Sequence, residues 1–423
     1  MRRARAGLAV LVIALVATLA VWRLNRLDEE ALPEVSRPFV PTAEQRVRGA
    51  YLALAGNCAG CHTTPGGATY AGGRAIATPF GTLYTSNLTP DADGLGGWSA
   101  AHFWRALHNG RSRDGRLLYP AFPYAHYTRV TREDSDALFA FLQSLPPAAV
   151  ATPAHQLRFP YDQPVALAVW RALFFRPGVH RADPAQPAEW NRGAYLASGL
   201  GHCGACHSPR NALGATASGD PLTGGAILSE NWVAPSLRSS AEAGLRGWPQ
   251  AAAVALLHTG IAPGATTSGP MGEVVFRSLQ HLTDADVGAL ATYLRSLPPE
   301  PSTGWPSVAV PPAALLARGE RIYGDRCVNC HGARGEGGSG FPPLAGNRAV
   351  TLPSPANVVQ VILHGGFSPA TAGNPRPHGM PPFLQTLDDG EVAAVASYVR
   401  NAWGNQAATV DAIEAWRLRG NAE

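Results

Sequence analysis

The six cysteines of this 423-residue chain all occur in one pattern, a Cys-x-x-Cys pair followed directly by His. Two thiols three positions apart on a helical turn can form thioether bonds to the two vinyl groups of one haem, and the adjacent imidazole can bind the iron from below. The sequence therefore predicts three covalently attached haems c. The attachment cysteines are Cys58 and Cys61, Cys203 and Cys206, and Cys327 and Cys330, and the proximal iron ligands are His62, His207 and His331.

Disulfides and zinc are the two other uses of such cysteine pairs. Six cysteines in an exported chain could form three disulfides, but disulfides give no reason for a histidine after each pair. Zinc sites usually combine two Cys-x-x-Cys pairs in one tetrahedral site, which an odd number of pairs fits poorly. Haem attachment accounts for all three copies, and we favour it.

A six-coordinate haem iron also needs a second axial ligand. In electron-transfer cytochromes this is usually Met, because thioether ligation raises the reduction potential. Besides Met1, the chain contains only Met271 and Met380, and each lies after its haem motif in the loop before a closing helix. We predict that Met271 and Met380 are the distal ligands of the second and third haems.

The first haem motif has no methionine downstream. The corresponding position is Phe122, which cannot bind iron. His126, four residues later, is the candidate ligand and would give a bis-His haem of lower potential; a vacant or weakly ligated iron is the alternative. His108 is less favoured, because its counterparts His258 and His364 occur where a methionine is already present.

The chain repeats one helical unit around each motif. A short helical segment leads into the motif, a Leu-His-x-Gly stretch lies midway, and an acid-led amphipathic helix closes the unit, with apolar residues at helical spacing. Pro-Pro pairs end the first two closing helices. The lead-in segments begin at Arg48, Arg192 and Arg318, and the closing helices are expected over Arg132–Leu145, Thr283–Leu297 and Asp388–Trp403.

This order of elements resembles the small class I cytochrome c fold. We predict a mainly α-helical chain of three tandem class I cytochrome c-like domains behind an N-terminal transmembrane anchor. Within the first linker, the apolar stretch Val165–Arg176 is expected to be a helix packed between domains, in preference to a contact with a partner or the membrane surface. The predicted boundaries are 1–26 for the signal or anchor, 43–147, 188–299 and 313–405 for the domains, 148–187 and 300–312 for the linkers, and 406–423 for a tail.

Residues 1–26 have the features of an export segment. Three arginines precede an uncharged apolar run from Gly7 to Trp22, and two more follow it. The run is shorter than the roughly 20 residues of a typical span, but Trp22 and the flanking arginines can extend it at the interfaces. We expect an uncleaved anchor with its N-terminus inside; a cleaved signal peptide is the alternative. Either places the chain on the periplasmic side of the bacterial cytoplasmic membrane.

The composition argues against several other functions. The net charge is +4, with acidic and basic residues mixed along the chain and no basic stripe of the kind that binds nucleic acid. All 34 basic residues are Arg, which excludes a P-loop or Schiff-base lysine. We therefore predict electron transfer. The alternatives are a peroxidase-like haem enzyme with an open iron in the first domain and a soluble periplasmic electron carrier.

Residues 44–405 resemble the membrane-bound triple-haem cytochrome c subunits of periplasmic dehydrogenases, such as those of alcohol dehydrogenase and gluconate 2-dehydrogenase. The resemblance implies that a catalytic subunit, a quinoprotein or a flavoprotein, oxidises its substrate. Electrons then pass through the three haems to ubiquinone or a terminal oxidase in the membrane. The segments that carry it are Ala71–Gly81, Asn87–Pro90, Gly201–Asn211, Pro342–Asn347 and Tyr398–Asn405.

The chain differs from the alcohol and gluconate pattern at Phe122, where those members have their first Met. Its Phe-Pro-Tyr-x-His version, from Phe122 to His126, is more similar to the cytochromes paired with molybdenum hydroxylases that act on N-heterocycles or aldehydes. The resemblance thus adds a molybdopterin enzyme to the possible partners and leaves the electron-transfer role unchanged.

Overall fold

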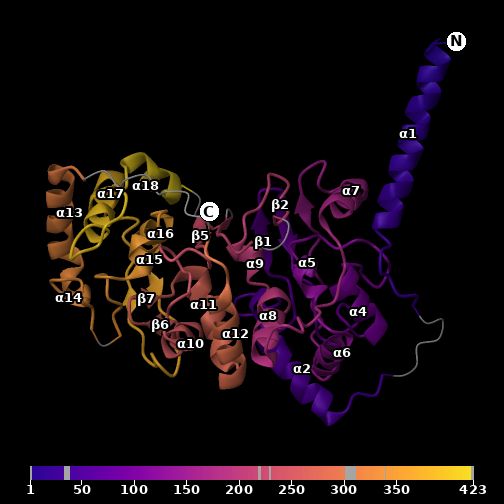
Figure 1. The fold of residues 1–423 in the computed structure, drawn as a ribbon, viewed down its shortest axis with the longest axis horizontal. Coiled ribbons are helices and arrows are strands. Elements are labelled where there is room, and N and C mark those ends of the chain that lie inside the picture. The colour runs from indigo at the N-terminus through magenta and orange to yellow at the C-terminus, as the bar shows by residue number, and fades with distance from the viewer. Residues whose placement is uncertain are drawn as a thin grey trace. The chain divides into compact units, whose positions relative to one another are not determined.

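The computed structural model of the chain describes residues 2–32, 39–217, 221–227, 230–300, 311–338 and 340–420, and Figure 1 labels its elements. Of the predicted linker 300–312, residues 301–310 lie outside this described part. The chain forms two compact units. The first comprises residues 1–182, 198–205 and 211–218, and the second comprises residues 183–197, 206–210 and 219–423.

Most of the first unit is one helical domain. Its first helix begins with a capping box between Thr42 and Gln45, and its last helix is capped by Thr131. These two helices pack against each other around a buried cluster that includes Leu52 and Phe139. The elements are α2 (Ala43–Ala55), α3 (Cys58–Cys61), β1 (Ala75–Thr78), β2 (Gly81–Tyr84), α4 (Ala100–Asn109), α5 (Tyr124–Tyr127), α6 (Arg132–Leu142) and β3 (Gln156–Leu157), and the strands pair antiparallel in the order β1-β2-β3.

The second unit contains the elements of two further domains, and most of its strands form two-residue antiparallel pairs. The earlier domain consists of α8 (Ala188–Ser198), α9 (Gly204–His207), β4 (Gly225–Ile227), β5 (Trp232–Ala234), α10 (Gln250–Thr259), β6 (Ile261–Ala262), β7 (Ala265–Thr266), α11 (Gly269–Arg277), the short 3-10 helix η1 (Leu279–His281) and α12 (Asp284–Ser296). The later domain consists of α13 (Ala313–Arg326), α14 (Val328–His331), α15 (Arg348–Thr351), α16 (Ala356–His364), β8 (Gly366–Phe367), β9 (Gly379–Met380), α17 (Asp389–Val399) and α18 (Ala412–Arg419).

In each domain the first and last helices cross in close contact at a glycine of the first helix. The glycine lies so close to the backbone of the last helix that a Cβ atom would overlap with a carbonyl oxygen there. The arginine before each glycine pairs with an acidic residue at the start of the same last helix, which sets the register of the crossing. The glycine contacts are Gly49 with Ala137, Gly193 with Ala289, and Gly319 with Ala394; the ion pairs are Arg48 with Asp134 at 2.6 Å, Arg192 with Asp286 at 2.7 Å, and Arg318 with Asp388 at 3.5 Å.

The helix α1 (Arg2–Leu24) precedes the first domain and extends away from the rest of its unit (Figure 1). By length and composition its segment Arg5–Leu24 can cross a membrane, and an N-terminal signal sequence would pass the same test. A second apolar helix, α7 (Pro164–Phe174), follows the first domain and packs against α1.

The stretch expected to be a helix packed between domains is the helix α7. It contacts Asn109 of the predicted first domain through Arg171 and Leu213 of the predicted second domain through Trp170, packs against α1, and leaves Val165, Val169 and Leu173 exposed. The predicted tail 406–423 differs from the expectation, because it contains α18, which is capped by Asp411 and packs against α16 and α17 with Ala415 fully buried. This difference arises from long-range packing, which a local pattern does not reveal.

The close helix crossing in the last domain makes a testable prediction. Replacing Gly319 with Ala should destabilise this domain by about 1–3 kcal/mol, because the new methyl group overlaps with the backbone of α17. Gly324→Ala, in the same helix α13, is the matched control: a Cβ there meets no atom, and removing the glycine should stabilise the helix by about 1 kcal/mol. Denaturant unfolding of the haem-loaded protein measures both, and equal effects of the two variants would contradict the proposed crossing.

Candidate haem sites

Each of the three predicted proximal histidines ends or directly follows a one-turn helix that carries the second cysteine of its pair, and each imidazole has the same hydrogen bond. The Nδ1 atom points to a backbone carbonyl oxygen from a loop farther along the chain. The distances are 2.7 Å from His62 to Ser86, 2.7 Å from His207 to Pro235, and 3.1 Å from His331 to Pro342.

This hydrogen bond determines which nitrogen can bind a metal. A carbonyl oxygen only accepts, so Nδ1 carries the proton and Nε2 keeps its lone pair. Burial lowers the pKa of His62 and of His331, because desolvation disfavours the imidazolium, and the accepting carbonyls of Ser86 and Pro342 oppose this. Both rings are therefore held as neutral imidazoles, the form that coordinates iron.

In the first and third motifs, the thiol of the first cysteine is desolvated. Desolvation raises the pKa of Cys58 to about 12 and that of Cys327 to about 11, so both thiols stay protonated at neutral pH. Cys58, Cys327 and Cys330 form no disulfide in this structure, so their sulfur atoms are available for the proposed haem attachment. Among the described residues, no group of three or more His, Cys, Asp or Glu side chains is arranged to hold a metal ion, as a zinc site would require.

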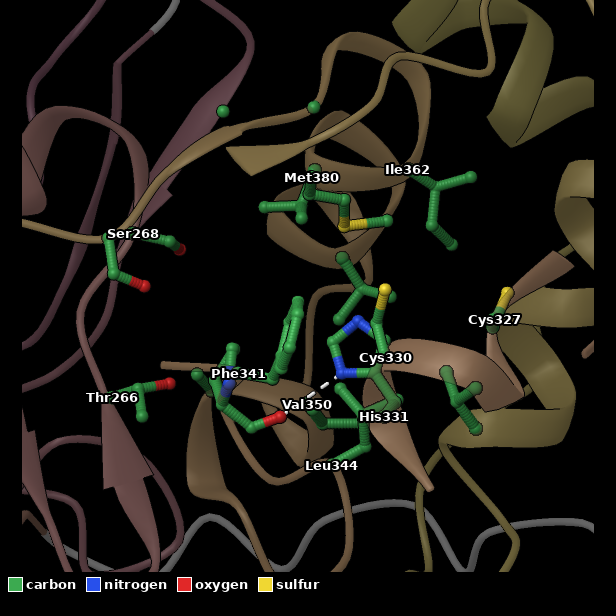
Figure 2. Close-up of a pocket in the computed structure, with 18 of the residues that line it drawn as sticks. Thr266, Ser268, Cys327, Cys330, His331, Phe341, Leu344, Val350, Ile362 and Met380 are labelled. Carbon is green, nitrogen blue, oxygen red and sulfur yellow. Dashed lines mark hydrogen bonds between the residues drawn. The ribbon is translucent and has the colours of Figure 1, made fainter. Parts of the chain in front are cut away.

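A cavity beside His331 has the lining that a haem needs. It encloses about 1430 Å³, counting the space at its open mouth. Cys327, Cys330 and His331 form one wall, and the rest of the lining is mainly apolar. Figure 2 shows the hydrogen bond from the His331 ring to the backbone. The apolar lining residues include Leu344, Val350, Val358, Val361, Ile362, Phe383, Leu387, Val395 and Val399.

Met380 lies across the same cavity from the predicted proximal histidine. It ends the short strand β9, which pairs with β8, and its side chain packs against the core cluster of this domain. In Figure 2 the Met380 sulfur and the His331 imidazole both project into the cavity. Thiols, imidazole, thioether and apolar walls together suit a covalently attached haem with His and Met ligands.

The second unit also brings the loop before α11 to this cavity. Thr266, Thr267, Ser268 and Gly269 line it, although they belong to the preceding domain. Met271, the predicted distal ligand of the second haem, is the third residue of α11 and is half-buried. The segment that leads to Met271, the predicted ligand of the second haem, therefore also lines the cavity of the third site.

Polar contacts hold these two domains together around that shared wall. The Asn357 side chain binds both the amide and the carbonyl of Val233, at 2.8 Å each. The Asn347 amide donates to the Thr266 hydroxyl at 2.9 Å. Arg348 donates to the Gly244 carbonyl at 2.9 Å, and its guanidinium lies over the Trp248 ring. The Asn357 and Arg348 hydrogen bonds go to backbone groups, so they fix the spacing of the two domains closely.

The first site is surrounded by aromatic side chains. Tyr70, Phe122 and Tyr127 belong to the same apolar cluster as Cys58, and the Phe122 and Tyr127 rings lie 5.4 Å apart. Burial raises the pKa of both tyrosines well above its usual range, with a further contribution from the nearby Cys58. Phe122 thus lies in the core beside the haem motif, where it supplies bulk and no ligand.

His126, the candidate ligand of the first haem, lies in the short helix α5 and is buried. It neighbours His202, whose pKa is lowered to about 4 by burial and by the positive charge that His126 can carry. The His202 ring in turn contacts Tyr127 at 5.4 Å. The structure therefore places His126 near the aromatic residues around Cys58 and next to the residue that precedes Cys203.

The histidines of the Leu-His-x-Gly stretches form structural contacts. His108 is buried, stacks on Trp104, and has both ring nitrogens engaged, by the Thr128 carbonyl at 3.0 Å and Asp28 at 3.2 Å. His258 likewise contacts the Gln280 carbonyl at 3.0 Å. The His108 and His258 rings thus connect the middle helices of their domains to the chain before the last helix, and His126 stays the predicted ligand.

Sequence reasoning missed the loop carbonyls and the tyrosines. Any residue can supply a carbonyl oxygen, so Ser86, Pro235 and Pro342 gave no signal. Tyr323, which lies beside Cys327 and donates to the Gly332 carbonyl at 2.6 Å, could have been found from its place in the segment leading into the motif.

Three helical domains, each with an imidazole held beside a thiol pair, define a c-type cytochrome. A family model for cytochrome c matches residues 47–146, 191–298 and 316–403, and the chain belongs to this family. The predicted fold class, mainly helical with three cytochrome c domains and an N-terminal apolar helix, is thereby confirmed.

Several curated relatives are similar over nearly the whole chain. One of the subunits of nicotinate dehydrogenase from Pseudomonas putida is 41% identical over 94% of this chain, which spans only 33% of that longer protein. The cytochrome c subunit of the quinone-type alcohol dehydrogenase of Gluconacetobacter polyoxogenes is 39% identical over 88% of this chain and 83% of the relative. The gluconate 2-dehydrogenase cytochrome c subunit of Pantoea cypripedii is 36% identical over 88% and 89%.

The two methionines can be tested as a matched pair. Met380→Leu keeps the bulk of the side chain and removes the sulfur. Because the third haem iron then loses its predicted sixth ligand, one of the three low-spin haem signals should disappear from the EPR spectrum. Met271→Leu should remove a different signal. Met380→His should instead keep the iron low-spin and lower its potential by a part of the roughly 0.8 V that axial ligands span. An unchanged spectrum in either Leu variant would contradict the assignment of that ligand.

Proposed function

We propose that this protein transfers electrons through three haems c, attached to the six cysteines, from a periplasmic dehydrogenase to ubiquinone or a terminal oxidase. The observation that carries the proposal is the hydrogen bond from Nδ1 to a loop carbonyl, which recurs in all three motifs. A structural cysteine pair would not need an oriented imidazole, whereas an electron-transfer haem needs one in each site.

The haem iron supplies a one-electron redox centre when it is bound. The residues of the chain determine how this centre is bound and what its redox potential is. His62, His207 and His331 present Nε2 as the proximal ligand, and Met271, Met380 and His126 are the proposed distal ligands. The apolar lining of the last cavity excludes water, and this lining and the ligand type are the means by which a protein adjusts redox potential.

The shared wall between the second and third sites supports stepwise transfer along the chain. Ser268 and Gly269 line the third cavity, and Met271 follows two residues later. We propose that electrons cross between the two haems through this segment. The Asn357 and Asn347 contacts hold it at constant spacing.

For the electron donor, we propose a molybdopterin dehydrogenase acting on N-heterocycles or aldehydes. Phe122 departs from the pattern of the alcohol and gluconate subunits, and the nicotinate dehydrogenase relative aligns with 94% of the chain. Quinoprotein and flavoprotein dehydrogenases are the other candidates, supported by the alcohol and gluconate relatives.

We propose that α1 remains attached as a membrane anchor. Asn25, directly after α1, is only 8% exposed and donates to the Ala168 carbonyl at 2.8 Å. Arg111 donates to the Asn25 carbonyl at 3.0 Å. The end of α1 is thus built into the folded domain, which favours an anchor over a removed signal and over a soluble carrier.

The electron-transfer role is tested by isolating the tagged full-length protein from its native membranes. We expect three haems c per chain, a dehydrogenase subunit that copurifies, and haem reduction when that subunit's substrate is added. Nicotinate, acetaldehyde, ethanol and gluconate distinguish the partner classes. Fewer than three haems, or haems that no such substrate reduces in the isolated complex, would contradict the proposal.

A second candidate function follows from Phe122. Phenylalanine in the usual methionine position could leave the first iron open, as in a haem enzyme that reacts with peroxide. The position of Phe122 in the aromatic cluster beside Cys58 is the observation that favours it. The choice between this function and electron transfer depends on His126.

The variant His126→Leu separates the two functions. If His126 is the distal ligand, the wild-type protein has three low-spin irons, and the variant has one high-spin iron that reacts with peroxide. His102→Leu is the matched control in the same domain, because His102 caps α4 through Ser99 and contacts the Trp98 ring. EPR spectra with and without peroxide measure the outcome. A wild-type protein that already has a high-spin, peroxide-reactive iron would favour the enzyme.

A further inference from the structure

The helix α7 has an exposed apolar stripe. Val165, Val169 and Leu173 recur every four residues, so they lie on one face of the helix, and they are 69%, 41% and 61% exposed. Phe159, before the helix, and Phe174, at its end, are exposed as well. Soluble proteins rarely expose a contiguous apolar surface of this kind unless something covers it.

The opposite face of α7 packs against the end of α1. Asn25 donates to the Ala168 carbonyl at 2.8 Å and accepts from Arg171 at 2.9 Å. Leu167 and Ala172 are buried on this side. The two helices are therefore joined at the last turn of α1 (Figure 1).

Arg171 fixes α7 to the first domain as well. Its side chain is buried, donates to the Asn109 carbonyl at 2.6 Å, and lies over the rings of Tyr124 and Phe175 at 4.9 and 4.8 Å. A charge buried this way and bound to backbone oxygens holds its helix in one position. The stripe on the other face is thus presented in a fixed direction.

The segment after α1 is also bound to the first domain. Glu29 pairs with Arg111 at 3.3 Å, and Glu30 pairs with Arg132 at 3.0 Å. Asp28 contacts buried His108 at 3.2 Å. The orientation of α1 relative to this domain is therefore set by several contacts within one compact unit.

We propose that α7 lies on the periplasmic surface of the membrane, with its apolar stripe inserted at the boundary between lipid headgroups and acyl chains. This rests on the proposed anchor role of α1. If α1 spans the bilayer, its last turn is at the interface, and the helix packed on that turn is there too. An interfacial helix buries its apolar face about 5–10 Å below the headgroups.

The residues around the stripe fit this position. Trp170 lies in α7 with its ring nitrogen satisfied by the Leu213 carbonyl, and Trp22 lies near the end of α1 with Arg26 over its ring at 4.7 Å. Tryptophan and arginine are typical of membrane interfaces. Arg176, just after α7, is exposed as a residue, although one nitrogen of its guanidinium donates to the Ala172 and Phe175 carbonyls. It is the basic residue at this end of the helix, where anionic lipid attracts positive charge, and Asp162 is an acidic residue near the other end.

The test uses single introduced cysteines that carry a nitroxide label, in full-length haem-loaded protein in vesicles of phosphatidylethanolamine and phosphatidylglycerol. The six native cysteines are occupied by haem. EPR compares collisions with oxygen, which enriches in lipid, and with a water-soluble nickel chelate. The test site is Val165→Cys and the matched control is Val47→Cys in α2, because the two valines are 69% and 73% exposed. Ile13→Cys in α1 reports the anchor.

We expect the ratio of oxygen to nickel collisions to be several-fold higher at position 165 than at position 47, and highest at position 13. A water-like ratio at 165 with a lipid-like ratio at 13 would overturn the surface role of α7 and leave the anchor intact. A water-like ratio at 13 would refute the anchor itself. If position 165 is shielded from both reagents only when a dehydrogenase subunit is bound, α7 is a protein interface and the proposal is wrong.

Discussion

One hydrogen bond determines what each motif of this chain can do. A Cys-x-x-Cys-His sequence brings two thiols and an imidazole together, but it does not decide which way the ring faces. The bond from Nδ1 of His62, His207 or His331 to a loop carbonyl makes that decision, because it leaves Nε2 as the only nitrogen with a lone pair. The carbonyls belong to loops of the same domains, whose outer helices cross at Gly49, Gly193 and Gly319.

The features of the fold and of the sites that could be predicted from the sequence are those encoded by residues close together in the chain. The cysteine-histidine motifs and the closing helices are recognised from neighbouring residues. The structure places Met380 in the lining of the cavity beside His331, and the roles of Met271 and Met380 as ligands stay predictions. The loop carbonyls could not be predicted, since Pro235 and His207 are far apart in sequence and a carbonyl has no residue signature. The helix α18 was missed because it is short and its stability comes from burial of Ala415 against distant elements.

The first domain differs in sequence from the other two at the position of the predicted distal ligand. Where a methionine is expected, it has Phe122 in an aromatic cluster, and the nearest candidate ligand is the buried His126. Ligand type is a strong determinant of haem potential. Haems with different axial ligands therefore differ in reduction potential, and this difference can give electron transfer a preferred direction. Three haems of equal potential would not.

The contacts of Asn25, Glu29 and Glu30 have a consequence for how this protein exchanges electrons. They bind the described residues from Asn25 to Glu30 to the first domain, so the end of α1 and this domain move as one body. On the proposed anchor and electron-transfer roles, the turnover of the protein should be insensitive to solvent viscosity and to periplasmic crowding, which slow a carrier that diffuses on a flexible linker. A donor and an acceptor would then bind to a cytochrome of fixed orientation.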